Sequence, residues 1–191
     1  MKKLWIALFS ALMLLSLSTC AFREDLTDYS VLLVKTLASG DVEAARAVAA
    51  ERNARLDDSS GERPVDFDEL LLLSRLIYAK AGERQYSEAL RMCVGEVALN
   101  RVASPEFPDT LAEVVYQKGQ YPCAWETEFA ELRPSRDCVR VALRLLQGER
   151  TMAPQVVYQS EWRIGPVYVR FYDRLIGYTY FCESVYPELY T

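Results

Sequence analysis

The order of apolar and polar positions along the chain predicts helices first. An apolar stripe through Leu70, Leu73 and Ile77 recurs at the helical period. Lys80 continues this stripe, so its charged group must either reach solvent or face a cleft. Residues 87–102 are apolar on two opposite faces, which is typical of a helix at the centre of a fold. Together with caps and glycines, the pattern predicts helices over residues 66–81, 87–102, 110–117 and 135–147.

The last 36 residues have a different pattern. They hold about ten of the chain's 22 aromatic residues, mixed with β-branched residues in short runs. Such runs are typical of strands. We expect strands around residues 156–158, 167–171 and 178–181, forming a small antiparallel sheet. The pattern therefore predicts an α+β fold, with the helices first and the sheet last.

The first 21 residues resemble an export signal. Lys2 and Lys3 give a positively charged start, and the uncharged apolar stretch over 4–17 has the length usual for such signals. This stretch is shorter than the roughly 20 apolar residues of a membrane span. We therefore expect a secreted protein, or one on the outer face of the cytoplasmic membrane. The alternatives are attachment through a retained signal, or through lipidation of Cys20, which ends a lipobox-like LSTC sequence.

Residues 22–64 are expected to form a helical spacer and linker. Two helical stretches are interrupted at Gly40, and the second, Val42 to Arg55, is rich in Ala, Glu and Arg, so it should bury little. Asp41 is a candidate N-cap for the second of them. Residues 57–64 are polar and rich in turn-forming residues, which is typical of a domain boundary. The main domain should therefore cover residues 65–191.

The composition restricts the chemistry of this chain. None of its 191 residues is His, which excludes Ser-His-Asp and Cys-His nucleophiles and metal sites built on imidazole. Acid–base chemistry would have to come from Asp, Glu, Lys or Tyr. The net charge of −5, without a basic run, argues against nucleic acid as a partner. We expect neither a metal nor another cofactor.

Four cysteines follow Cys20, an even number that suits disulfide bonding in an exported protein. Four cysteines allow three pairings. We favour Cys123 with Cys138, because these two enclose a loop rich in Pro and charged residues, and this choice leaves Cys93 with Cys182. A zinc site is the alternative, but the chain has no CxxC pair of the kind that zinc ribbons use.

Four segments of the main domain carry a specific combination of motifs. They are residues 76–83 (LIYAKAGE), 94–102 (VGEVALNRV), 104–111 (SPEFPDTL) and 114–121 (VVYQKGQY). This combination resembles the cell-wall hydrolase family typified by the spore-cortex-lytic enzyme SleB, and segments 156–159 and 176–182 resemble the last strands of that family. The resemblance covers about residues 66–183. The cysteine positions resemble those of the cysteine-bearing clostridial members.

The resemblance implies a lysozyme-like domain that cleaves the glycan strands of peptidoglycan, as a muramidase or lytic transglycosylase. In this family one essential Glu donates a proton to the glycosidic oxygen while positive charge develops on the sugar, so no metal or His is needed. Such an acid needs a raised pKa, which a partly apolar helix face beside a cleft would supply. The implied partner is the peptidoglycan glycan strand.

This sequence departs from the family at the presumed acid. Aligned through the YA and AG dipeptides, the family's Glu corresponds to Lys80, whose ammonium group cannot act as the same acid. Three hypotheses follow. Glu83 takes over the catalytic role, or Glu96 supplies the carboxyl group from across the cleft, or the protein is a catalytically inactive relative that binds glycan.

The resemblance also implies a set of substrate-binding residues. The positions that fall in the family's Val-Tyr-Gln-x-Gly-Gln block are Tyr116, Gln117, Gln120 and Tyr121. This block should border the glycan groove, where aromatic rings can stack on sugars while their polar groups bond hydroxyls. We expect Trp125, Trp162 and most of the C-terminal tyrosines to fill the core of the sheet instead.

Overall fold

The computed structural model describes residues 26–56 and 61–190. The predicted export signal, with Cys20, and residues 57–60 of the predicted linker lie outside the described residues. Within the two described ranges, none of the helices has the length and apolar character that a membrane crossing requires.

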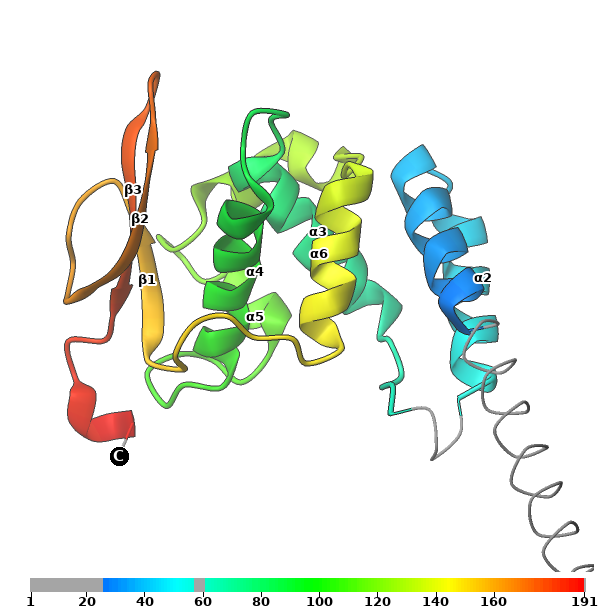
Figure 1. The fold of residues 1–191 in the computed structure, drawn as a ribbon, viewed down its shortest axis with the longest axis horizontal. Coiled ribbons are helices and arrows are strands. Elements are labelled where there is room, and N and C mark those ends of the chain that lie inside the picture. The colour runs from blue at the N-terminus through cyan, green and yellow to red at the C-terminus, as the bar shows by residue number, and fades with distance from the viewer. Residues whose placement is uncertain (1–25, 57–60, 191) are drawn as a thin grey trace, which may run out of the picture.

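The predicted α+β class is confirmed. After a helix over residues 26–39, the α-helices are α2 (Val42–Ala54), α3 (Phe67–Ala81), α4 (Glu88–Val102), α5 (Leu111–Val115) and α6 (Arg136–Leu146). The 3₁₀-helices are η1 (Pro122–Trp125), η2 (Thr127–Glu131) and η3 (Pro187–Tyr190). The strands are β1 (Val156–Ser160), β2 (Val167–Asp173) and β3 (Gly177–Glu183), in the antiparallel order β1–β3–β2. The small sheet stands at one end of a lysozyme-like helical body (Figure 1).

The helices begin where the sequence places capping residues. The N-cap residues of α2 to α6 are Asp41, Asp66, Ser87, Thr110 and Ser135. Each of these side chains accepts a hydrogen bond from a backbone N–H in the first turn. The first turn of a helix leaves such N–H groups without an intrahelical partner. The caps therefore explain why the predicted starting points agree closely with the structure.

Helix α4 lies at the centre of the helical part, as its two apolar faces predicted. It packs against α3, α5, α6 and β1, and most of its residues are buried. The close approach of three helices requires Gly95. A Cβ atom at this position would lie 2.5 Å from Leu145 of α6 and 2.8 Å from Ile77 of α3. One added methyl group would therefore have to displace the side-chain ends of Leu145 and Ile77 within the packed core.

The N-terminal helices form a hairpin that packs beside α6 (Figure 1). Leu33, Leu37, Ala45 and Ala49 of this hairpin are almost completely buried, and they belong to the same hydrophobic core as α3, α4 and α6. The expectation that this segment buries little is therefore wrong. Leu33 and Leu37 fill the contact between the hairpin and the core, and Ala45 and Ala49 are the buried residues of α2 in that contact.

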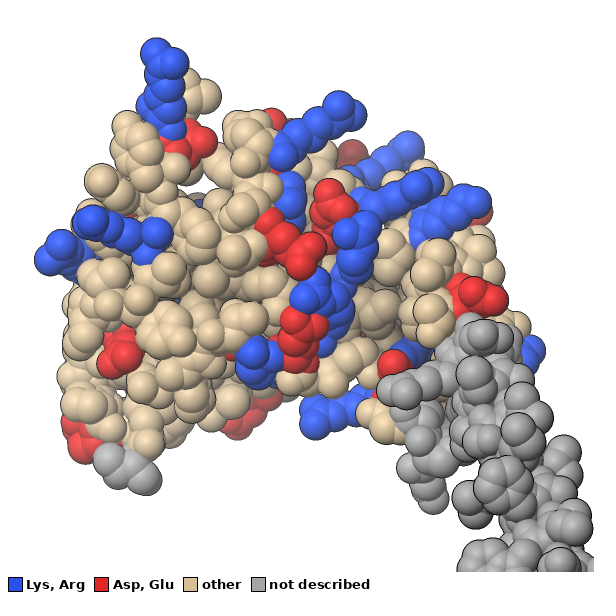
Figure 2. Space-filling view, viewed as in Figure 1, with Lys and Arg blue, Asp and Glu red and all other residues tan. Residues whose placement is uncertain are grey.

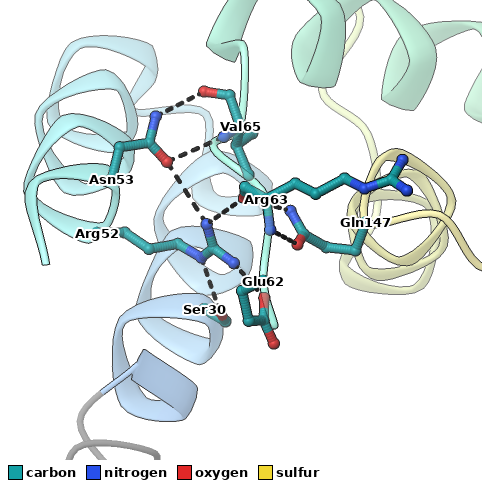
Figure 3. A network of polar contacts seen from close by, with 7 residues as sticks. All are labelled: Ser30, Arg52, Asn53, Glu62, Arg63, Val65 and Gln147. Carbon is teal, nitrogen blue, oxygen red and sulfur yellow. Dashed lines mark hydrogen bonds and ion pairs between the residues drawn. The ribbon is translucent and has the colours of Figure 1, made fainter. Parts of the chain in front are cut away.

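Two side-chain amides hold the chain segment that leads from the hairpin into α3 (Figure 3). Asn53 donates to the carbonyl of Val65 at 2.8 Å and accepts from its N–H at 2.9 Å. Gln147 of α6 makes the same pair of bonds with Arg63, at 2.9 and 2.8 Å. Each amide thus replaces a neighbouring strand for one residue of this segment, which satisfies backbone groups that would otherwise need water.

Arg52 fastens the same segment from inside. Its side chain is fully buried, and its guanidinium donates to the hydroxyl of Ser30 at 3.0 Å and to the carbonyl of Arg63 at 3.2 Å. It also forms an ion pair with Glu62 (Figure 3). A buried guanidinium is tolerated when its N–H groups and its charge are matched in this way. The hairpin is therefore docked on the domain by a specific contact.

Charged side chains of both signs are mixed over the helical body. Figure 2 shows Lys and Arg beside Asp and Glu along most of this face, whereas the end that carries the sheet has fewer charged groups. Several of these neighbours are ion pairs, such as Arg144 with Glu88 and Glu149, each at 2.5 Å. The face therefore presents no broad field of a single sign.

Candidate functional site

A groove of about 890 Å³ lies at the C-terminal end of α3. One wall is formed by the last turn of α3 and the turn after it, with Lys80 and Glu83. The opposite wall is formed by η1 and η2, with Cys123, Glu126 and Glu128. Lys80 is exposed, and its side chain lines this concave surface. Lys80 therefore faces a cleft, which was one of the two positions expected for its charged group.

Arg91 of α4 fixes the first wall. Its guanidinium donates to the carbonyl of Ala81 at 3.0 Å and to the carbonyl of Glu83 at 2.9 Å. These bonds satisfy carbonyl groups at the point where a helix end leaves them free. Gly82 permits the tight turn, because a Cβ atom there would lie only 2.4 Å from the carbonyl oxygen of Tyr78. The backbone at Glu83 is therefore held in place although its side chain is exposed.

Tyr121 fixes the start of the second wall. Only 3% of the residue is exposed, and its ring centroid lies 5.0 Å from the guanidinium carbon of Arg101. The same guanidinium lies 4.9 Å from the Phe107 ring and donates to the carbonyl of Val157 at 2.7 Å. Burial raises the pKa of Tyr121, and Arg101 opposes that shift. Tyr121 thus packs between α4 and η1 and does not line the groove.

The groove contains a positive charge without a direct protein partner. Within residues 26–56 and 61–190, Lys80 makes neither an ion pair nor a hydrogen bond. It is near enough to Cys123 to act on that thiol: burial raises the pKa of Cys123, the Lys80 ammonium lowers it, and the Glu126 carboxylate raises it again. An ammonium, a thiol and a carboxylate therefore share one part of the groove.

Glu96 lies elsewhere. Its side chain is fully buried and accepts hydrogen bonds from the backbone N–H groups of Thr151 and Met152 at 2.8–2.9 Å, and from the hydroxyl of Thr151 at 2.7 Å. These bonds join the middle of α4 to the segment that enters β1. The carboxyl group is thus surrounded by donors inside the protein and does not line the groove.

The other predicted binding residues are divided between the surface and the interior. Tyr116 is 44% exposed, and its ring meets those of Trp125 and Phe129 edge to face, with centroids 6.5 and 6.4 Å apart. Phe129 lines the groove; Tyr116 and Trp125 do not line it, but the Tyr116 ring packs against Phe129. Gln117 and Gln120 are half-buried and do not line it. Tyr116 is therefore the member of the predicted set with the best access to a ligand there.

The expectation that the two late tryptophans fill the core is wrong. Trp125 is 63% exposed and Trp162 is 66% exposed. The sheet packs only one side against the helices, through residues such as Val156 and Phe181, and its outer side has no layer above it within the described chain. Neither tryptophan lies on a strand, because Trp125 ends η1 and Trp162 follows β1. The C-terminal tyrosines are all exposed or half-buried, so the expectation is wrong for them as well.

Neither predicted disulfide is present. Cys93, Cys123, Cys138 and Cys182 are all free thiols in the structure. Burial and, to a lesser degree, Glu96 raise the pKa of Cys93 to about 11, and burial also raises the pKa of Cys138. Thiols with raised pKa values are slow to oxidise because the thiolate is the reactive form. The structure thus does not show the predicted pairs, and the pairing stays a prediction.

Sequence reasoning missed the acidic residues of the second wall. Glu126 and Glu128 lie in the irregular segment between two predicted helices, where no periodicity indicates a direction for their side chains. Their closeness in sequence to Cys123 and to the Tyr116 block was the available signal. No group of three or more Cys, Asp or Glu within the described ranges could hold a metal ion.

Comparison with known proteins gives a match over part of the chain. Residues 86–175 match a protein-family model described as Cell Wall Hydrolase. Neither a search of curated proteins nor a search of solved structures gave a significant match. The matched residues contain α4, α5, the second wall of the groove, α6, β1 and β2, and they begin after Lys80 and Glu83. The cell-wall hydrolase resemblance is therefore confirmed over residues 86–175, and this match supports a peptidoglycan hydrolase-like role.

Proposed function

We propose that this protein acts outside the cytoplasmic membrane, belongs as a whole to the cell-wall hydrolase type, and binds glycan strands of peptidoglycan without cleaving them. One observation carries the proposal. Lys80, at the position where the resembling family has its acid, lies in a groove whose opposite wall belongs to the matched residues. The binding surface is thus retained while its proton donor is replaced.

The composition of the groove suits a sugar chain. Glu83, Glu126 and Glu128 offer acceptors for sugar hydroxyls, and the Lys80 ammonium offers donors for carbonyl or carboxylate groups. Tyr116 and Trp125 add exposed rings beside Phe129, on which apolar sugar faces can pack. Concave surfaces that combine a few charged groups with aromatic rings are typical of ligand sites.

The available carboxyl groups do not reproduce the family's acid. Glu96 is inside the protein and bonded to backbone N–H groups, so we assign it a structural role. Glu83 is exposed, whereas a general acid at neutral pH is ordinarily shielded by apolar neighbours. An ammonium at position 80 is a poor proton donor. Binding without cleavage is therefore the better interpretation.

A second candidate function is residual cleavage, and the acidic lining of the groove favours it. Glu83 is the family motif's second acidic position, and Glu126 and Glu128 lie on the wall across from it. Any of the three would act as the acid only if a bound glycan excluded water from its carboxyl group. Glu83 is the first to test because its backbone is held by Arg91.

Co-sedimentation with purified sacculi and release of soluble muropeptides test the two candidates together. We expect the wild type to co-sediment and to release nothing, and Lys80→Glu to gain release. Lys80→Met is the matched control, since it removes the charge without supplying an acid, and it should release nothing. Release by the wild type that Glu83→Gln abolishes would establish cleavage instead. Absence of co-sedimentation by every form would overturn both candidates and leave a structural protein.

We further propose that residues 1–21 direct export and that the hairpin and residues 65–191 form one folded unit afterwards. The buried contacts of Leu33, Leu37 and Arg52 support the second statement. The mass of the mature protein tests the first. Cleavage after Ala21 indicates secretion, a diacylglycerol-modified Cys20 indicates a lipoprotein, and an intact N-terminus indicates a retained anchor.

A further inference from the structure

The part of the β2–β3 hairpin over residues 170–180 has an outer face that is open to solvent. Tyr172 pairs with Tyr178 across the strands, and Arg170 pairs with Tyr180. Val169 and Phe171, which alternate with these residues on β2, pack against the core. Because side chains alternate between the two faces of a strand, Arg170 and Tyr172 point away from the helical body. Tyr172 and Tyr178 are 67% and 40% exposed.

The three tyrosines form a contiguous cluster, with Tyr172 across from Tyr178 on the neighbouring strand and Tyr180 two residues further along β3. The ring centroids of Tyr172 and Tyr178 are 5.1 Å apart, and those of Tyr178 and Tyr180 are 5.7 Å apart. The rings are tilted by 57° and 38° to one another. A cluster of this kind offers both apolar surface and hydroxyl groups.

Two arginines lie beside the tyrosine cluster. The guanidinium carbon of Arg170 lies 4.8 Å from the Tyr178 ring centroid, and that of Arg163, from the β1–β2 loop, lies 5.9 Å from the Tyr180 ring centroid. Within the described ranges neither guanidinium has an ion-pair partner. Asp173, the acidic residue at the end of β2, instead accepts bonds from the backbone of its own turn.

We propose that Arg163, Arg170, Tyr172, Tyr178 and Tyr180, the tyrosine–arginine face, form a second binding site for a carboxylated glycan, namely the peptidoglycan strand, which carries carboxylates on its stem peptides and, on units without a peptide, on its lactyl groups. The tyrosines contact the sugar rings, and the two arginines form charge-assisted hydrogen bonds with the carboxylates. The unneutralised guanidinium groups provide charge complementarity to such a chain and none to a neutral one. This site lies outside the groove and goes beyond the function proposed there.

NMR titration of the isotope-labelled full chain with soluble peptidoglycan fragments tests this site separately from the groove. We expect shifts at backbone amides within 163–180 with peptidoglycan fragments, and much weaker ones with a neutral chitooligosaccharide. Tyr178→Ala should weaken binding at this face about tenfold. Arg170→Met should weaken it about threefold. Tyr186→Ala, which removes another exposed tyrosine, is the matched control and should have no effect.

The possible outcomes separate this site from the groove. Shifts confined to the groove, around Lys80 and Phe129, would overturn the second site while the proposed function stands. Shifts confined to 163–180 would support the second site and overturn binding in the groove. Equal response to the neutral oligosaccharide would overturn the role of the arginines. Concentration-dependent association through this face, without any glycan response, would identify a second copy of the chain as its partner and overturn the proposal.

Discussion

Two basic residues occupy the same place in their helices but very different surroundings. Arg52 lies in the last turn of α2 and Lys80 in the last turn of α3. Arg52 is fully buried and bonded to Ser30, Arg63 and Glu62 (Figure 3). Lys80 is exposed in the groove and has no direct partner within the described chain. One cation is committed to the fold, and the other is free for a ligand.

The difference follows from the cost of burial. A charge that leaves water must be matched by partners, or the fold does not form. A charge at the wall of a groove keeps water on one side and needs no such match. Fixed partners therefore indicate a structural role for Arg52, whereas the proposed function assigns ligand binding to Lys80. Substitutions at the two positions should separate these roles.

The largest expected effect is that of Arg52→Met. Loss of its hydrogen bonds and ion pair should lower the free energy of unfolding by about 3 kcal/mol. Lys80→Met, the same change at the groove, should alter it by less than about 0.5 kcal/mol. Urea unfolding of both variants measures the contrast. Equal effects would mean that the two cations do not differ in role.

The same comparison applies to two glutamates. Glu96→Gln should lower the free energy of unfolding by about 2 kcal/mol, since the amide can no longer accept on both sides from Thr151 and Met152. Glu83→Gln, at the exposed wall, should be nearly neutral for stability. Thermal unfolding of the two variants gives the answer. A neutral Glu96→Gln would reopen a catalytic role for that residue.

The amides around the linker should have intermediate effects. Asn53→Ala leaves the N–H and carbonyl of Val65 without their partner, so we expect a loss of about 1–2 kcal/mol. Gln85→Ala is the matched control, because Gln85 is an exposed residue of the groove, and it should be neutral. The midpoints of denaturant unfolding of the two variants measure this difference. A neutral Asn53→Ala would show that water replaces the amide.

Much of the fold could be predicted because local rules agree with the packing. The caps at Asp66, Ser87 and Ser135 lie where the helices begin, and the two apolar faces of residues 87–102 indicated the central helix. The hairpin was underestimated because its contact depends on two leucines and on small alanines. The number of large apolar residues in a helix does not show how closely that helix packs against the rest of the core.

The candidate site was only partly predictable. Lys80 was placed by a motif, and the structure puts it in a groove. Glu126 lies between the two 3₁₀-helices and Glu128 lies in the second, a stretch without periodicity, so only the folded chain brings them opposite Lys80. Tyr121 lies in the same motif block as Tyr116, yet one ring is buried against Arg101 and the other is exposed. Residues close together in one motif can therefore have different roles, one in packing and the other on the surface.

The cysteines should show the difference between interior and groove as a difference in rate. Burial and Glu96 raise the pKa of Cys93 to about 11, so little thiolate is present at pH 8 and its modification should be slow. Cys123 lines the groove beside Lys80 and should react first. Labelling followed by mass spectrometry of peptides identifies the order. A chain without reactive thiols after denaturation would instead show that the cysteines are paired in disulfides, and mapping of the linked peptides would then identify the pairing.

The smallest effect concerns the exposed pair Arg46–Asp68, which joins α2 to α3 at 2.7 Å. The hydrogen bond from Arg46 lowers the pKa of Asp68. Because the folded-state value is depressed, the pair stabilises the fold above the unfolded pKa of about 3.9 and loses this contribution as the pH falls through the folded value. The stability difference between the wild type and Arg46→Met should therefore shrink from pH 7 to pH 2, and also in high salt.

A remainder at pH 2 is expected, because Arg46 lies 4.4 Å from the Phe67 ring centroid and that contact does not titrate. A difference that grows on acidification would contradict this assignment.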